Sequence, residues 1–200
     1  NHDIINNMTY TAKTFEFRAL KGISELTLKE HIGLYNGYVK HYNLATDLVA
    51  QNIGNVDNQY LATEINRRRS FEYNGIKNHE YYFADLSGEH VALNESSELG
   101  KKIVETWGSA EAWRAEFEKI AMTRGIGWAI LSYDPETRVL QNGWVDEQHL
   151  GHLNSTKYIL GIDMWEHSYV ADYQPSGKKQ YVTDFLDQVS WEGATARYEN

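Results

Sequence analysis

The sequence contains no cysteine, which excludes disulfide frameworks, cysteine-ligated zinc, iron–sulfur clusters and thiol nucleophiles. No segment approaches the roughly 18 consecutive apolar residues of a membrane-spanning helix, so no membrane partner is expected. Basic residues are also scarce: 19 Lys and Arg against 28 Asp and Glu leave a net charge of -9. Nonspecific binding to nucleic acids depends on basic side chains that neutralise phosphates, so this sign argues against nucleic acid as a partner.

Aromatic residues and histidine, in contrast, are abundant. The chain of 200 residues has 6 Trp, 14 Tyr and 8 His, and it has room for one domain or for two small halves that share a core. Hydrophobic residues make up 42% and charged residues 24%, as in a soluble globular protein, which excludes disorder over the whole chain. The compartment stays open between the cytoplasm, an organelle and the outside, because a core of this size needs no disulfides.

The first half is predicted to be a helical hairpin. Apolar and aromatic residues recur at helical spacing over residues 27–49 and again over residues 59–86, and the turn at Gly54 separates the two segments. Thr27 and Glu30 are predicted to form the capping box that begins the first helix, because their side chains can satisfy its first backbone amides.

The second half is predicted to be an α/β region with a small three-stranded antiparallel sheet, which makes the whole an α+β fold. Ser109 is the expected N-cap of a helix. The expected elements are two helices within residues 98–122, strands over 127–133, 138–145 and 158–163, and a final helix over 178–188. The expected organisation is an extended N-terminal arm over residues 1–22 with Phe15 and Phe17 available for docking, a helical hairpin domain over 23–90 and a C-terminal α/β domain over 91–200.

Four side chains form a candidate metal site. His31 and His79 lie on the apolar faces of the two predicted hairpin helices, Asp163 ends an apolar strand, and His167 follows four residues later at the expected start of a helix. Each histidine alone is most often a satisfied core residue. An ionised Asp that closes a buried strand is costly unless it is paired or bound to metal, so metal binding explains the set better. Three imidazoles and a carboxylate suit Fe or Mn, and zinc also fits on ligand type alone.

Several segments together make the sequence recognisable. From about Phe15 to Arg197, in one order and with matching spacings, it resembles the iron/manganese superoxide dismutase family. The segments that carry the resemblance are Gly22-Ile23-Ser24, Leu28-Lys29-Glu30-His31, Gly37-Tyr38-Val39, Asn78-His79-Glu80-x-x-Phe83, Trp107-Gly108-Ser109-x-x-x-Trp113-x-x-x-Phe117, Gly127-Trp128, and Asp163-x-Trp165-Glu166-His167 with the later Tyr173, Trp191 and Arg197.

The resemblance implies a helical hairpin and an α/β half with the metal site between them. It implies one Mn or Fe ion per chain, held by His31, His79, Asp163, His167 and a solvent molecule. The implied reaction is the conversion of superoxide anion to dioxygen and hydrogen peroxide by alternating reduction and oxidation of that ion.

The resemblance also implies roles around the metal. Tyr38 matches a tyrosine that borders the substrate channel and relays protons, and Gln148 matches a residue that hydrogen-bonds the metal-bound solvent, in an arrangement that favours Mn. Trp128 and Trp165 would line the metal cavity, and Lys178 would lie near the substrate funnel. The alternatives are a surface loop residue for Gln148, plain core packing for the tryptophans and a solvated helix start for Lys178.

Three departures from the family pattern stand out. His31 and Tyr38 are seven residues apart, one fewer than in well-known members, which predicts a one-residue adjustment in the helix. Tyr35 replaces a histidine adjacent to the ligands, and Val170 replaces the tyrosine that meets that histidine across the dimer interface. Glu166, which in the family pairs with the partner subunit's ligand histidine, is retained, so a homodimer is expected.

Two other functions compete with the dismutase. One is a protein of the same fold that binds metal or serves a structural role without redox activity. The retained ligands, together with Tyr38 and Gln148, argue against it. The other is a hydrolytic metalloenzyme, which lacks an evident general base beside the ligands.

Overall fold

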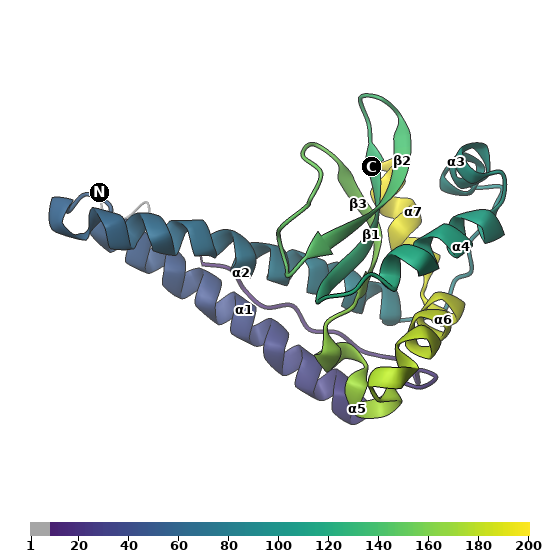
Figure 1. Cartoon of the computed structure of the whole chain (residues 1–200), viewed down its shortest axis with the longest axis horizontal. Coiled ribbons are helices and arrows are strands. Elements are labelled where there is room, and N and C mark those ends of the chain that lie inside the picture. Colours follow the sequence, from purple (N-terminus) through teal and green to yellow (C-terminus); the bar gives the residue numbers. More distant parts are fainter. Residues whose placement is uncertain (1–8) are drawn as a thin grey trace.

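Two long helices, α1 (Glu25–Asn52) and α2 (Gln59–Leu86), form the N-terminal part of the protein. The computed structural model describes residues 9–200. In Figure 1 the two helices lie side by side and run in opposite directions, joined by a tight connection at one end of the molecule. The helix predicted over 59–86 is confirmed at both bounds, and the one predicted over 27–49 is longer at each end.

The start of α1 differs from the prediction. Ser24, with an extended backbone, is the N-cap, and its hydroxyl accepts a hydrogen bond of 3.1 Å from the backbone amide of Thr27. The capping box predicted for Thr27 and Glu30 is therefore wrong, because Thr27 is buried inside the first turn. The backbone amide of Ser24 donates to Asp172 Oδ2 at 2.8 Å, so a residue far along the chain helps to fix where the helix begins.

The described part of the N-terminal arm follows the hairpin as an extended segment (Figure 1). Phe15 docks on α2 and α1, with its ring 5.3 Å from that of Phe83 and 5.9 Å from that of Tyr35. Phe17 pairs with Ser87 in an isolated antiparallel bridge. Residues 1–8 of the predicted arm lie outside the described residues.

The sheet has the predicted three antiparallel strands. They are β1 (Gly127–Asp134), β2 (Val139–Asp146) and β3 (Lys157–Asp163), in the spatial order β2-β1-β3. The central strand β1 is buried over its first six residues, as its apolar sequence requires. In the register, Trp128 of β1 faces Val145 on one side and Asp163 on the other, which places the last residue of β3 beside a buried indole.

The α-helices of the C-terminal part are α3 (Glu98–Trp107), α4 (Ala110–Ala121), α5 (Val170–Tyr173), α6 (Lys178–Gln188) and α7 (Trp191–Glu199). In Figure 1, α3, α4 and α7 lie on one side of the sheet, and α5 lies near the start of α1. Ser109 caps α4 as predicted, and α6 has the predicted bounds. It is not the final helix, however, because α7 follows it. This short helix buries only Trp191 and Ala194, and its other residues are half-buried or exposed, so its apolar signal in the sequence is weak.

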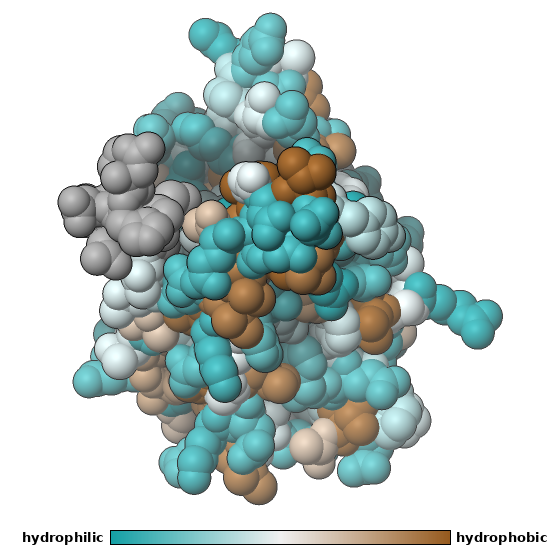
Figure 2. Space-filling model, turned by 90° about the vertical axis from the view of Figure 1, so that its left-hand side faces the viewer, coloured by the Kyte–Doolittle hydropathy of each residue, from teal (hydrophilic) through white to brown (hydrophobic). Residues whose placement is uncertain are grey.

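The free end of the hairpin exposes several hydrophobic side chains, among them Ile53, Val56 and Leu61. Figure 2 views this end of the molecule and shows the hydrophobic atoms interspersed with hydrophilic ones. Within residues 9–200, no helix is both long enough and apolar enough to cross a membrane.

A buried ion pair attaches α7 to α2. Arg197 Nη2 lies 2.5 Å from Oδ2 of Asp85, and the same guanidinium donates to the carbonyl oxygen of Ile159 in β3. The backbone amide of Ser190 donates to the carbonyl oxygen of Asp85 at 2.8 Å. Burial raises the pKa of Asp85 to about 6, although the charge of Arg197 opposes the shift. Burial therefore destabilises the ionised carboxylate by more than the ion pair with Arg197 stabilises it.

This balance predicts a specific pH dependence of stability. Between the unfolded pKa of 3.8 and the folded value of about 6, Asp85 binds a proton more tightly in the folded protein. Its contribution to the free energy of unfolding is therefore fully present below about pH 4 and falls by about 3 kcal/mol as the pH rises from there through the folded pKa of about 6. Denaturant unfolding of wild type and Asp85→Asn from pH 4 to 7 measures this effect. The free energy of unfolding of wild type should fall relative to that of Asp85→Asn as the pH rises. Asp57→Asn, at an exposed turn, is the control, and a difference independent of pH would contradict the assignment.

Candidate metal centre

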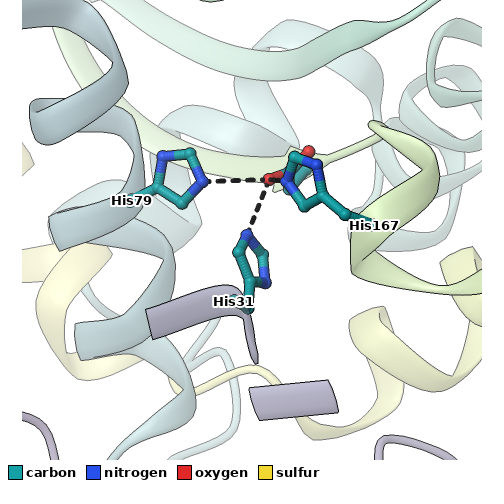
Figure 3. Close-up of side chains that lie close together, drawn as sticks. His31, His79 and His167 are labelled. Carbon is teal, nitrogen blue, oxygen red and sulfur yellow. Dashed lines mark hydrogen bonds and ion pairs between the residues drawn. The ribbon is translucent and has the colours of Figure 1, made fainter. Parts of the chain in front are cut away.

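Four side chains from separate elements converge between the hairpin and the sheet. His31 comes from α1, His79 from α2, Asp163 from the end of β3, and His167 from the 3-10 turn Glu166–Ser168. Their ligand atoms all lie within 4.8 Å of one another. Figure 3 shows the three imidazoles pointing at one carboxylate oxygen.

That oxygen is Oδ2 of Asp163. It lies 3.0 Å from Nε2 of His31, 3.2 Å from Nε2 of His167 and 3.4 Å from Nε2 of His79. His31, His79 and Asp163 are buried, whereas the side chain of His167 is 23% exposed. The sequence-predicted ligand set is thus brought to a single point.

The approach of His167 differs from the expected geometry. Asp163 is the last residue of β3, as predicted, but His167 lies in a 3-10 turn and not at the start of an α-helix. Its Oδ1 accepts from the backbone amide of Trp165 at 2.8 Å, which turns the chain immediately after the strand. The 3-10 turn that follows returns His167 to the same side, so the four-residue spacing works through a turn.

The protonation of the cluster favours a bound cation. His79 Nδ1 bonds to the carbonyl oxygen of Gly75 at 2.6 Å, an acceptor only, so Nδ1 carries the proton. Burial lowers the pKa of His79 to about 3 and also lowers the pKa of His31, so both rings are neutral at pH 7. Burial by itself would raise the pKa of Asp163, but contacts with His167 and His31 outweigh it and hold the pKa below its usual range.

The surroundings of one buried nitrogen atom, Nε2 of His79, show that the cluster fits a metal ion. His79 Nε2 is buried and has no hydrogen-bond partner among the described residues, and it faces the carboxylate of Asp163. With its proton on Nδ1, His79 presents a lone pair at Nε2, and the Asp163 oxygen opposite is also an acceptor, so neither can donate a hydrogen bond to the other. A cation between them interacts favourably with both. Three imidazole nitrogens and one carboxylate, without thiolate, suit Mn or Fe.

Gln148 lies beside this cluster and is not the surface residue that the alternative interpretation expected, since its side chain is fully buried. Its Oε1 accepts from Trp128 Nε1 at 2.9 Å, and its Nε2 donates to the hydroxyl of Tyr38 at 2.9 Å. An indole N–H can only donate, so the amide oxygen must face Trp128 and the NH₂ group must face Tyr38. The orientation of Gln148 is therefore determined by its neighbours.

The main chain of Gln148 is held as well, by residues that the sequence analysis did not single out. Asn78 Nδ2, buried next to His79, donates to the Gln148 carbonyl oxygen at 3.0 Å, and His152 Nε2 lies 3.1 Å from the same oxygen. Glu147 has a positive φ of 51°, and its carbonyl oxygen accepts from Trp165 Nε1. In the sequence, Asn78 stands out only as the first residue of the Asn78-His79-Glu80 segment that carries the family resemblance.

Tyr38 reaches the site from an uninterrupted helix, so the one-residue adjustment expected in α1 is absent. Seven residues turn an α-helix through about 700°, nearly two full turns, which leaves His31 and Tyr38 on one face. The Tyr38 ring lies 5.1 Å from that of His79. Burial raises the pKa of the Tyr38 hydroxyl, which keeps it protonated at neutral pH.

The two tryptophans lie against the cluster. Trp128 is fully buried with its ring 5.1 Å from that of His79, and the Trp165 ring stacks 5.8 Å from that of His167. Both therefore surround the ligands with apolar surface while their N–H groups hold the Gln148 loop.

Tyr35 makes its contacts within the chain. It is fully buried, donates to Glu80 Oε1 at 3.0 Å and accepts from the backbone amide of Lys13 at 2.9 Å. Glu80 also accepts from Tyr10 and pairs with the ammonium of Lys13 at 2.8 Å, so the N-terminal arm is tied to the carboxylate beside His79. Val170, the other replaced residue, is partly buried and begins α5.

Lys178 and Glu166 lie at the margin of the site. Lys178 is partly buried, donates to the Thr123 carbonyl oxygen at 2.8 Å and lies 5.9 Å from the Trp144 ring, so it is not a freely solvated helix start. Its contacts place it apart from the four converging side chains. Glu166 is exposed and directly precedes His167.

Comparisons with known proteins agree with this arrangement. Residues 95–197 match the family model described as "Iron/manganese superoxide dismutases, C-terminal domain". The chain is 35% identical over 189 residues to a manganese superoxide dismutase of Haloferax volcanii, with 92% of each chain covered. It is 34% identical over 191 residues to a manganese superoxide dismutase of Haloarcula marismortui, covering 92% of this chain and 90% of that protein. Identity to an iron superoxide dismutase of Cupriavidus metallidurans is 31% over 182 residues and 90% of each chain.

Gly75 packs so closely against the Tyr38 ring that a larger residue should disturb the site. A Cβ at Gly75 would lie 2.6 Å from Cδ1 of the Tyr38 ring, whereas one at Gly33 meets nothing within 4 Å. Gly75→Ala should displace Tyr38 from Gln148 and lower the free energy of unfolding by about 1–3 kcal/mol. Gly33→Ala, the matched control in α1, should raise it by about 0.5–1 kcal/mol through helix propensity. Denaturant unfolding at equal metal content compares them, and equal stability of the two variants would refute the packing argument.

Proposed function

The chain belongs to the iron/manganese superoxide dismutase family, and we propose that His31, His79, Asp163 and His167 hold the redox-active metal of this enzyme. Its reaction is the conversion of superoxide to dioxygen and hydrogen peroxide, which makes it an oxidoreductase with superoxide as substrate. The observation that carries the ligand assignment is the buried His79 Nε2, which faces the Asp163 carboxylate without a hydrogen-bond partner among the described residues.

The charges of the proposed ligands suit a metal ion whose oxidation state changes by one. When bound, the metal ion accepts an electron from one superoxide and donates it to the next. His31 and His79 contribute neutral nitrogens, and Asp163 contributes a single negative charge. The protein therefore balances part of the ion's charge and leaves the rest to its surroundings. Trp128 and Trp165 keep those surroundings apolar.

Peroxide formation needs protons, and we assign their delivery to Tyr38. Its Oη accepts from Gln148 Nε2, so the Tyr38 hydroxyl proton is not used in that bond and can be donated. The raised pKa keeps this proton in place at neutral pH. Gln148 holds the Tyr38 oxygen, and Trp128 in turn holds Gln148. The proton donor is thus positioned by side chains that are themselves fixed.

Mn is the metal that we propose over Fe. Gln148 reaches the site from the C-terminal α/β part of the chain, the arrangement that the family resemblance associates with Mn. The relatives from Haloferax volcanii and Haloarcula marismortui are named as manganese enzymes, whereas that from Cupriavidus metallidurans is named as an iron enzyme.

We further propose that two copies of the chain form a homodimer. Glu166 is exposed although it directly precedes His167, which leaves its carboxylate accessible to a second copy. The proposed organisation of each copy is an arm over residues 1–22, a hairpin domain over 23–90 and an α/β domain over 91–200. In this arrangement Glu166 would pair with the ligand histidine of the other subunit.

Metal loading tests the activity and the ligand set together. Wild type, His79→Ala and the exposed-site control His90→Ala are loaded separately with Mn and Fe, and dismutation is measured per bound metal. Loss of a ligand should lower metal retention and turnover by more than roughly 100-fold in His79→Ala, with His90→Ala unchanged. A His79→Ala protein that keeps its metal and its turnover would overturn the ligand set. Wild type that holds stoichiometric metal without activity would indicate the redox-inactive alternative.

The dimer is tested by size-exclusion chromatography with light scattering on the metal-loaded protein. Wild type should have twice the chain mass of 23.1 kDa, and Glu166→Ala should shift toward the monomer because the pairing across the interface is lost. Glu192→Ala, exposed on α7, is the control for removing one surface carboxylate. A wild-type monomer with full metal and full activity would remove the bridging role of Glu166.

A further inference from the structure

A cleft of about 380 Å³ lies between the second half of α2, the start of β3 and α7. Three cationic side chains line it, and none of the described residues that line it is acidic. Hydroxyl groups and amides complete its wall. This is unusual in a chain with a net charge of -9. The cationic residues are Lys77, Lys157 and Arg197.

The two lysines of the cleft are only partly neutralised by carboxylates. Glu80 lies 3.5 Å from the ammonium of Lys77 but also 2.8 Å from that of Lys13, so one carboxylate faces two lysines. Lys157 donates to the carbonyl oxygen of Tyr198 at 3.4 Å, which is a neutral acceptor.

Arg197 differs from the lysines, because it is matched by Asp85. The cations Lys13, Lys77, Lys157 and Arg197 and the carboxylates Glu80 and Asp85 together carry an excess of two positive charges beside the cleft.

The wall of the cleft is rigid. The rings of Tyr81 and Tyr158 lie 4.7 Å apart, and the Arg197 guanidinium lies over both, 5.1 Å and 5.9 Å from their centres. Arg197 is itself held by the Ile159 carbonyl oxygen. The Arg197 guanidinium and the two rings are therefore positioned before any ligand arrives, which lowers the entropic cost of binding.

The cleft is separate from the metal centre but connected to it. None of the four converging side chains lines it. Asn78 and His152 do, and both contact the carbonyl oxygen of Gln148. A ligand in the cleft would thus lie against the two side chains that hold the main chain of Gln148.

We propose that this cleft binds a phosphate group, as inorganic phosphate or as a small phosphate monoester. Lysine ammonium groups act as compact point charges that suit a phosphate oxyanion of two negative charges. The excess of two positive charges matches that ligand charge, whereas a monocarboxylate would leave one positive charge uncompensated. Tyr73 and Tyr81 line the same cleft, and their hydroxyls are the donors that we assign to the remaining oxygens.

Isothermal titration of the Mn-loaded protein with inorganic phosphate, at low and constant ionic strength, tests the site. Wild type should bind phosphate saturably, and Lys77→Gln/Lys157→Gln should bind it roughly tenfold or more weakly, because two charge-assisted contacts are lost. The matched control is Lys101→Gln/Lys102→Gln in α3, whose lysines pair with Glu98 and Glu105 and which should bind like wild type. The single variant Lys157→Glu repeats the test without touching the contacts of Glu80, and it should also weaken binding.

Either of two results would overturn the proposal: no saturable phosphate binding by wild type, or equal affinity in the cleft variants and the control. Adenosine monophosphate in the same titration distinguishes the two ligand sources. Tighter binding than phosphate identifies a monoester whose ring contacts the tyrosine wall, and equal or weaker binding identifies the free anion. The titration reads binding directly, so its outcome is independent of the dismutase activity.

Discussion

One carboxylate oxygen, Oδ2 of Asp163, is the point on which the site depends. A buried ionised group is costly unless charge or hydrogen bonds compensate it, and here three imidazoles from three separate segments approach it to within 3.4 Å. His31 and His79 come from the two hairpin helices, and Asp163 comes from the sheet. The proposed metal site therefore joins the two parts of the fold, and its formation requires that both are in place.

Around that oxygen, several side chains are oriented by hydrogen-bond partners that can act only as a donor or only as an acceptor. The proton on His79 Nδ1 is assigned by the Gly75 carbonyl oxygen, and the amide of Gln148 is oriented by the Trp128 indole. Tyr38 is then placed by Gln148. Such a chain of determined bonds makes the site rigid before metal or substrate is bound, which is how preorganised sites avoid reorganisation during the reaction.

The chain also shows how a family site can be surrounded by different contacts. Tyr35, in place of a histidine, turns to Glu80, and Glu80 in turn holds the N-terminal arm through Tyr10 and Lys13. Glu80 directly follows His79, one of the proposed metal ligands. Since Lys77 also approaches Glu80, the same carboxylate belongs both to the surroundings of the metal and to the margin of the cationic cleft.

The sequence by itself determined what depends on local pattern. Helical periodicity placed the bounds of α2, apolar runs placed the strands, and the spacing of three histidines and Asp163 indicated the cluster. Contacts between distant segments were decided only by the tertiary structure: the start of α1 at Ser24, which Asp172 helps to hold, the helix α7, and the burial of Gln148. The reason is physical. Period and propensity act over a few residues, whereas a cap bonded across the fold or a polar side chain fully removed from water depends on partners that only folding brings together.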